Sequence, residues 1–144
     1  MHLIHGIADT TGIQYICPQN EQCASFEADA YARFRGLGCA IATSGPGATN
    51  LVTGIAASYY DSIPVLYITG NQTRARMNTM GTRQYGFQST PIVDLVKGIT
   101  KYAVTITDET LVIETLTDAI AIAQRHRKGP VLVDIPDDVQ RAMI

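Results

Sequence analysis

Two runs of consecutive apolar residues, Val65–Ile68 and Val131–Val133, stand between segments of helical periodicity. A strand that is apolar on both sides must be covered on both faces of its sheet, as parallel strands usually are. Alternation of such strands with helices is typical of α/β proteins. We therefore expect an open, mainly parallel sheet with helices on both faces, in a single domain spanning residues 1–144.

Turn residues and apolar spacing predict the remaining elements. Strands are expected at Ile13–Cys17, Gly38–Thr43, Pro64–Thr69, Lys101–Ile106 and Pro130–Ile135. Helices are expected over His2–Asp9, Glu21–Arg35, Ala48–Tyr60, Pro91–Lys97 and from Asp108 to the region of Lys128. In the second helix, one face carries Cys23, Phe26, Ala30 and Phe34. Because a doubly wound sheet normally begins with a strand, we expect the first helix and strand of such a domain to be missing here.

Composition and charge argue against several classes of protein. The formal net charge of −2 leaves no basic stripe, so we expect no nucleic-acid partner. No apolar run reaches the roughly 20 residues of a membrane-spanning helix, and the first residues do not resemble a signal peptide. Cys17, Cys23 and Cys39 lack metal-ligand spacing and are expected to be small buried hydrophobic residues. A reducing, cytoplasmic location follows as the default.

Ligands of open parallel sheets bind beyond the carboxyl ends of the strands, so the residues after each strand are candidates for a site. Glu21 follows the first expected strand and begins a helix, where the helix dipole alone also favours an acidic side chain. Ser44–Asn50 follows the second strand and contains glycines that could expose N–H groups to an anion. It lacks the lysine of a phosphate loop and the spacing of a dinucleotide loop, so a tight structural turn explains it at least as well.

A long stretch without apolar periodicity, Asn71–Thr90, carries Arg74, Arg76 and Arg83. Loops of this length are uncommon inside compact domains and are usually functional or disordered. The stretch is therefore a candidate functional segment.

Several segments share a pattern when they are taken in order along the chain. Asn20-Glu21-Gln22 and Ala28–Arg33 are followed by Ala42–Ile55, which contains Ser-Gly-Pro-Gly-Ala-Thr-Asn. The pattern continues through Asp61–Val65, Ile68–Gly70, Gly86–Gln88, Thr100-Lys101 and Gly129–Pro136. Together these segments resemble the N-terminal, pyrimidine-binding domain of the acetolactate synthase large subunits, which are thiamine-diphosphate enzymes. The resemblance covers nearly the whole chain, and the ordered set is far more specific than any one piece.

The resemblance implies roles for particular residues. In the family, the glutamate at the position of Glu21 binds N1′ of the aminopyrimidine ring, so Glu21 is expected to be both catalytic and cofactor-binding. Pro46, Gly47 and Asn50 match a loop that lines the cofactor cleft and the subunit contact, and they are expected to bind the cofactor.

Phe87 and Gln88 match a pair that approaches the substrate in this family. Their place at the end of the long loop indicates a lid, with a flexible surface segment as the competing interpretation. Three residues depart from the family pattern, namely Asn20 for a histidine, Ser89 for an acidic residue and Asp137 for a lysine. These departures leave open another 2-keto-acid decarboxylase or lyase of the family, and also a non-catalytic interaction domain that keeps the fold.

The resemblance further implies an enzyme for decarboxylation and carboligation of pyruvate, as in branched-chain amino acid biosynthesis. Its cofactors are thiamine diphosphate and Mg²⁺, and the diphosphate and the metal are held by a diphosphate-binding domain of another subunit. We expect a homodimer or homotetramer, no metal ligand in this chain, and central and diphosphate-binding domains that this chain does not contain. The resemblance leaves open whether the parent enzyme binds FAD, and nothing in this chain supports an FAD site. Alone, the chain is expected to be catalytically incomplete.

Overall fold

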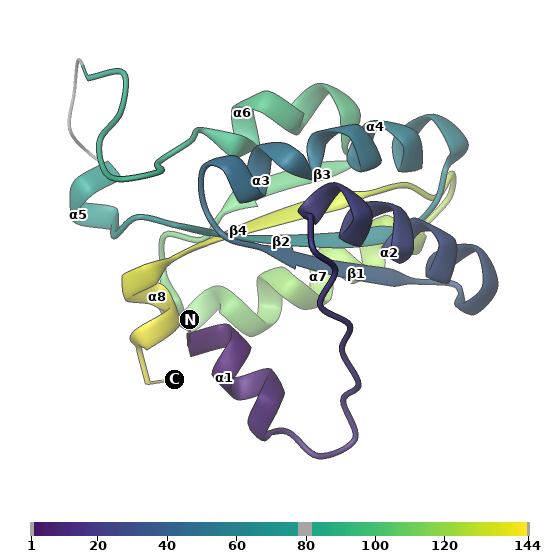
Figure 1. Ribbon diagram of the computed structural model, residues 1–144, viewed down its shortest axis with the longest axis horizontal. Helices are drawn as coiled ribbons and strands as arrows, with labels where there is room; N and C mark the ends of the chain where they lie inside the picture. The colour runs from purple at the N-terminus through teal and green to yellow at the C-terminus, as the bar shows by residue number, and fades with distance from the viewer. Residues whose placement is uncertain (1, 78–81, 144) are drawn as a thin grey trace.

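The computed structural model describes residues 2–77 and 82–143. A parallel sheet with the strand order β1-β2-β4-β3 forms its centre. Its strands are β1 (Gly38–Ala42), β2 (Val65–Asn71), β3 (Tyr102–Thr105) and β4 (Val131–Pro136). Helices cover both faces of the sheet (Figure 1). The expected α/β class with a parallel sheet is confirmed.

In Figure 1, α4 and α6 lie above the sheet and α1 and α7 below it. Helix α2 is drawn in front of β1, and its Ala28 and Ala32 belong to the same core as Ile55 of α4. The bounds of the helices are α1 (His2–Asp9), α2 (Glu21–Arg35), α3 (Pro46–Asn50), α4 (Val52–Asp61), α5 (Arg74–Met77), α6 (Ile92–Val96), α7 (Val112–Gln124) and α8 (Asp137–Arg141). Two 3-10 turns, η1 (Lys97–Ile99) and η2 (Glu109–Leu111), precede β3 and α7. The sequence patterns did not predict α5 or α8.

Two helices differ in extent from the prediction. The helix expected over Ala48–Tyr60 is divided at Leu51 into α3 and α4. The helix expected to reach the region of Lys128 ends at Gln124, because Arg125 adopts extended dihedral angles (φ −77°, ψ 146°). It also begins later than expected, at Val112. Asp108 caps the preceding 3-10 turn η2, because its side chain accepts a hydrogen bond from the Thr110 backbone N–H at 2.9 Å.

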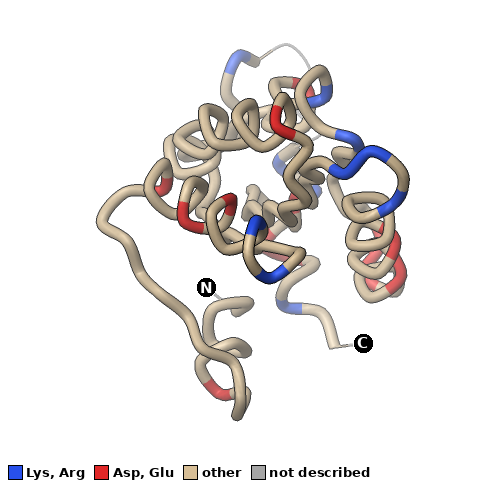
Figure 2. The backbone as a smooth tube through the Cα atoms, turned by 90° about the vertical axis from the view of Figure 1, so that its right-hand side faces the viewer, with Lys and Arg blue, Asp and Glu red and all other residues tan. Residues whose placement is uncertain are grey.

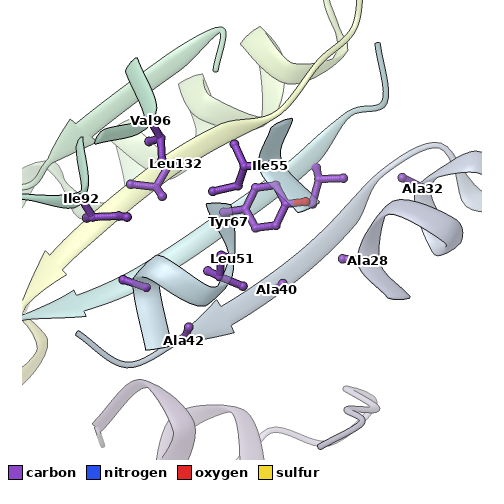
Figure 3. Close-up of a cluster of buried hydrophobic side chains, with 12 residues drawn as sticks. Ala28, Ala32, Ala40, Ala42, Leu51, Ile55, Tyr67, Ile92, Val96 and Leu132 are labelled. Atoms are coloured by element: carbon purple, nitrogen blue, oxygen red, sulfur yellow. The ribbon is translucent and has the colours of Figure 1, made fainter. Parts of the chain in front are cut away.

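Side chains of β2 alternate between two hydrophobic cores, which explains its continuous apolar run. Tyr67 points toward α4 and lies with Leu51 and Ile55 in one core (Figure 3). Val65 belongs to the same core. On the opposite face the core contains Leu66, Ile68, Ala119, Ala123, Val131 and Val133. The sheet is therefore covered on both sides, as the two apolar runs predicted.

The prediction of a strand over Ile13–Cys17 is wrong. The segment pairs with no described strand, and Ile13, Tyr15 and Ile16 are exposed. It connects α1 on one face of the sheet with α2 on the other, and so passes from face to face instead of running along β1 (Figure 1). A β-type pattern reports local preference only, whereas a strand also needs a neighbour for its N–H and C=O groups.

The expected burial of the three cysteines is also wrong, because Cys17, Cys23 and Cys39 are all exposed and none forms a disulfide. Cys17 belongs to the unpaired segment, and Cys23 lies on the outer side of α2. That outer side also carries Phe26 and Phe34, whose side chains are 43% and 89% exposed.

The inner side of α2 carries small and polar residues because the helix packs unusually close to its neighbours. A Cβ atom on Gly38 of β1 would lie 2.0 Å from the Ala28 carbonyl oxygen, and one on Gly54 of α4 would lie 2.0 Å from Ser25 Oγ. Large side chains do not fit at such separations. The apolar stripe of this helix is therefore left on the surface.

Charged residues of both signs are interspersed along the chain (Figure 2). Arg33 illustrates their pairing, since it lies 2.6 Å from carboxylate oxygens of both Asp29 and Asp61. In the described ranges, every helix is too short or too polar to cross a membrane.

Candidate functional site

Glu21 stands at the first position of α2, and its neighbour Asn20 fixes the start of that helix. Asn20 is extended (φ −142°, ψ 141°), and its Oδ1 accepts the Gln22 backbone N–H at 2.8 Å. The half-buried Glu21 side chain points toward the end of α3, where Asn50 Nδ2 donates to Glu21 Oε2 at 3.0 Å. Among residues 2–77 and 82–143, Asn50 is the one side chain that donates to this carboxylate. The structure thus joins two predicted site residues that are far apart in sequence.

Gly47 forms the wall beside this carboxylate. A Cβ atom here would lie 2.8 Å from Thr43 Cγ2 and 3.4 Å from Glu21 Oε1. A larger residue at this position would press on Thr43, which follows β1, and would crowd Glu21 Oε1. Pro46 precedes it as the first residue of α3 and is exposed.

Gly45 makes the turn that leads from β1 into α3. Its dihedral angles (φ 65°, ψ −122°) are accessible to glycine and unfavourable for other residues. Its carbonyl oxygen accepts the Thr49 backbone N–H at 2.9 Å, which closes the first turn of the helix. The Ser44–Asn50 segment is therefore a tight turn whose geometry depends on glycine.

The turn that carries Phe87 and Gln88 lies against Gly45. A Cβ atom on Gly45 would come within 2.5 Å of the Gln88 carbonyl oxygen and 2.7 Å of Gln88 Cβ. Gln88 itself has a left-handed backbone (φ 56°), and the Phe87 side chain is 79% exposed. The structure thus brings Gln88 to the rim of the Glu21 site and leaves the Phe87 ring facing outward.

A second carboxylate near the strand ends was not singled out from the sequence. Asp134 of β4 is completely buried and accepts hydrogen bonds from Thr69 Oγ1 at 2.7 Å, Asn71 Nδ2 at 2.7 Å and Thr105 Oγ1 at 3.1 Å. Burial raises the pKa of Asp134, and the three hydrogen bonds oppose that rise. The sequence did carry a signal for this residue. Asp134 is an acidic residue inside an apolar strand, and a strand buried on both faces rarely contains one.

The long loop is anchored where it begins. Arg74 Nε donates to Asp138 Oδ2 at 2.7 Å, and Arg74 Nη1 donates to Glu109 Oε2 at 2.8 Å. Burial alone would raise the pKa of Asp138. The hydrogen bonds from Arg74 and its positive charge outweigh that effect, so the pKa of Asp138 is lowered. Residues 78–81 of the loop lie outside the described residues.

A hollow of about 580 Å³ lies at the carboxyl ends of β1, β2 and β4, and its walls include Ser44, Gln72, Arg76 and Gln140. Glu21 and Asn50 do not line it. In the described part of the chain, no three His, Cys, Asp or Glu side chains come together as metal ligands would.

The family described as "Thiamine pyrophosphate enzyme, N-terminal TPP binding domain" matches residues 1–97, and the chain belongs to this family. Among its relatives are acetolactate synthase 2, chloroplastic, of Nicotiana tabacum, with 38% identity over 100% of this chain, and acetolactate synthase, chloroplastic, of Arabidopsis thaliana, with 39% identity over 99%. Acetolactate synthase 2, chloroplastic, of Zea mays is 44% identical over 87% of the chain. These alignments cover 21%, 21% and 19% of the three relatives, so the chain spans about a fifth of their length. The resemblance seen in the sequence motifs is confirmed.

The expectation of a cytoplasmic location is wrong on this comparison, because these relatives carry the description chloroplastic. The expectation rested on unpaired cysteines, which indicate reducing surroundings. Such cysteines do not distinguish one reducing compartment from another.

Proposed function

We propose that this chain forms the pyrimidine-binding half of a thiamine-diphosphate site in an enzyme that decarboxylates pyruvate and carries out carboligation, as the resemblance to acetolactate synthases implies. The observation that carries the proposal is the contact of 3.0 Å between Asn50 Nδ2 and Glu21 Oε2, beside Gly47, which places no side chain against this carboxylate. Family membership supports the choice of cofactor.

Each residue of the site has a defined task in this proposal. Glu21 holds a proton at N1′ of the aminopyrimidine ring, and Asn50 orients its carboxylate by donating to Oε2. Gly47 leaves room for the ring at Oε1, and Pro46 lines the outer rim. Thiamine diphosphate, when bound, supplies the carbon nucleophile and the electron sink for decarboxylation of a 2-keto acid.

The substrate is proposed to meet Phe87 and Gln88. The contact between Gln88 and Gly45 holds their turn at the rim of the Glu21 site. The exposed Phe87 ring is free to cover an apolar part of a keto acid or its acceptor.

Other parts of the site are proposed to come from a partner. Mg²⁺ and the diphosphate group are assigned to a diphosphate-binding domain of another subunit in a homodimer or homotetramer. Exposed apolar side chains on α2 and α4 support an apolar contact of this kind, among them Phe26, Tyr31, Phe34 and Tyr60. A role in branched-chain amino acid biosynthesis follows if the reaction is that of an acetolactate synthase.

Pyruvate consumption by the full product of the reading frame that encodes this chain tests the proposal. Turnover should require thiamine diphosphate and Mg²⁺ and should be lost in Glu21→Gln. Glu27→Gln is the matched control, because Glu27 is an exposed residue of the same helix, and this variant should retain wild-type turnover.

Other outcomes separate the alternatives. Cofactor binding without pyruvate turnover would indicate that the substrate is another 2-keto acid. A protein that binds no thiamine diphosphate would contradict the catalytic proposal and leave a non-catalytic interaction domain.

A further inference from the structure

The turn that carries Phe87 and Gln88 is closed by its own backbone and by one serine. Ser89 Oγ accepts the backbone N–H groups of Tyr85 at 3.1 Å and Gly86 at 3.2 Å. The Ser89 backbone N–H donates to the Gly86 carbonyl oxygen at 3.1 Å. Ser89 therefore gives the turn a fixed internal shape.

An internal shape does not place the turn on the rest of the protein, and Gln72 supplies that attachment. Gln72 Nε2 donates to the Phe87 carbonyl oxygen at 2.6 Å. Gly86 lies against the same side chain so closely that a Cβ atom on it would be 2.7 Å from Gln72 Cγ. Gly45 limits the turn at a second point, through Gln88.

Gln72 is itself fixed by the buried polar cluster. Its backbone N–H donates to Asn71 Oδ1 at 2.9 Å, and Asn71 Nδ2 donates to Asp134 Oδ2 at 2.7 Å. Asp134 is fully buried in the sheet, so a continuous chain of hydrogen bonds leads from the core to the Phe87 carbonyl oxygen. A residue attached in this way transmits the position of the rigid sheet to the turn.

We propose that Gln72 is a positioning residue for the substrate, because its amide fixes the Phe87–Gln88 turn at the rim of the Glu21 site. The inference rests on the proposed function. Gln72 acts on the keto acid through Phe87 and Gln88 and does not act on the cofactor, which Glu21, Gly47 and Asn50 hold independently of this turn.

The first test measures hydrogen exchange of the Tyr85, Gly86 and Ser89 amides in this chain, in the wild type and in Gln72→Met. Methionine matches the length of glutamine and lacks the donor. It also lacks the Oε1 that accepts from Arg76 Nη1 at 3.3 Å. Loss of the shorter hydrogen bond to the Phe87 carbonyl oxygen should speed exchange roughly three- to tenfold. Gln84→Met is the matched control at an exposed glutamine of the same loop and should leave exchange unchanged. Equal exchange in Gln72→Met and the wild type would overturn the proposal whatever the activity.

The second test measures the kinetics of the full product of the reading frame. Gln72→Met should raise KM for the keto acid roughly three- to tenfold, with kcat and the half-saturating concentration of thiamine diphosphate unchanged. Gln72→Glu can donate to the Phe87 carbonyl oxygen only when its new carboxyl group is protonated. Arg76, whose Nη1 donates to Gln72 Oε1 at 3.3 Å, faces that group and favours its charged form. The KM defect of Gln72→Glu, measured against wild type at each pH, should therefore shrink as pH falls toward the pKa of that carboxyl group, whereas the defect of Gln72→Met should not.

The outcomes distinguish this inference from the proposed function. If the wild type shows no thiamine-dependent turnover, the proposed function is contradicted. The proposed role of Gln72 in positioning the substrate is then contradicted as well. An active wild type whose KM is unchanged by Gln72→Met overturns the inference alone. Weaker thiamine diphosphate binding in Gln72→Met would also overturn it, because the residue would then act on the cofactor.

Discussion

Two carboxylates near the carboxyl end of the sheet differ in how completely the protein satisfies them. Asp134 is fully buried, and three side chains from β2 and β3 donate to it. Glu21 is half-buried, receives one side-chain donor among the described residues, Asn50, and lies beside Gly47, which carries no side chain. A buried carboxylate that accepts all its hydrogen bonds from the protein stabilises the fold. A carboxylate that can still accept hydrogen bonds is able to bind a ligand.

This difference means that the two residues should respond oppositely to substitution. Changes at Asp134 should lower the stability of the chain, and changes at Glu21 should affect cofactor chemistry with little change in stability. The Gly45 turn lies between these extremes, since it is part of the fold and also forms the rim of the site.

Asp134→Ala should have the largest effect on stability. It leaves the donors of Thr69, Asn71 and Thr105 without their acceptor inside the protein and should lower the free energy of unfolding by about 3 kcal/mol. Urea denaturation measures this, with the exposed Asp118→Ala as the control that should stay within about 0.5 kcal/mol of wild type. If Asp134→Ala lowers the free energy of unfolding no more than the control does, the structural role of Asp134 is contradicted.

Gly45→Ala should lower the free energy of unfolding by about 2 kcal/mol, because alanine is strained at this left-handed φ and would meet Gln88. Gly98→Ala is the matched control, since nothing lies within 4 Å of a Cβ atom there and its φ is not left-handed. Thermal unfolding should separate the two variants clearly. Equal stability would mean that the Gly45 turn and Gln88 are not in contact.

The pH dependence of stability should reveal the burial of Asp134. A carboxyl group whose pKa is raised on folding stabilises the protein most below its unfolded value, near 3.8, and this contribution is lost as pH rises through the folded value. The difference in unfolding free energy between wild type and Asp134→Asn should therefore fall as pH rises from about 4. Urea titrations at a series of pH values would show this fall, and a difference that grew with pH would have the wrong sign.

Glu21→Gln should have the smallest effect on stability, within about 0.5 kcal/mol, because glutamine keeps a carbonyl oxygen for Asn50 Nδ2. Chemical denaturation of the variant beside wild type measures it. A loss as large as that of Asp134→Ala would mean that Glu21 is a structural residue and that the contrast between the two carboxylates is false.

The sequence predicted most of the sheet because burial on both faces leaves a strong local signal, as in Val65–Ile68. It failed for Ile13–Cys17, whose β-type residues have no neighbouring strand to pair with. It could not show that the apolar stripe of α2, with Phe26 and Phe34, lies outward, since that depends on the close approach of Gly38 and Gly54. Whether a strand or a helix face is covered depends on residues distant in sequence.

The sequence indicated the members of the candidate site but not the contacts between them. Family motifs indicated Glu21 and Asn50, and the structure joins them. The attachment of the Phe87–Gln88 turn to Gln72 has no sequence signal, because a polar residue in a polar loop is unremarkable until its partner is known. Hydrogen bonds between loops depend on the folded backbone, and local patterns do not encode them.

The most direct test of the role of Glu21 is the rate of hydrogen–deuterium exchange at C2 of thiamine diphosphate bound to the full product of the reading frame. Glu21→Gln should slow this exchange on the order of 10²- to 10⁴-fold, as expected when a positioned proton-transfer group is removed. Asp134→Asn, measured where it is folded, should leave the rate near that of wild type. Equal rates in wild type and Glu21→Gln would contradict the assignment of Glu21 as the residue that activates the cofactor.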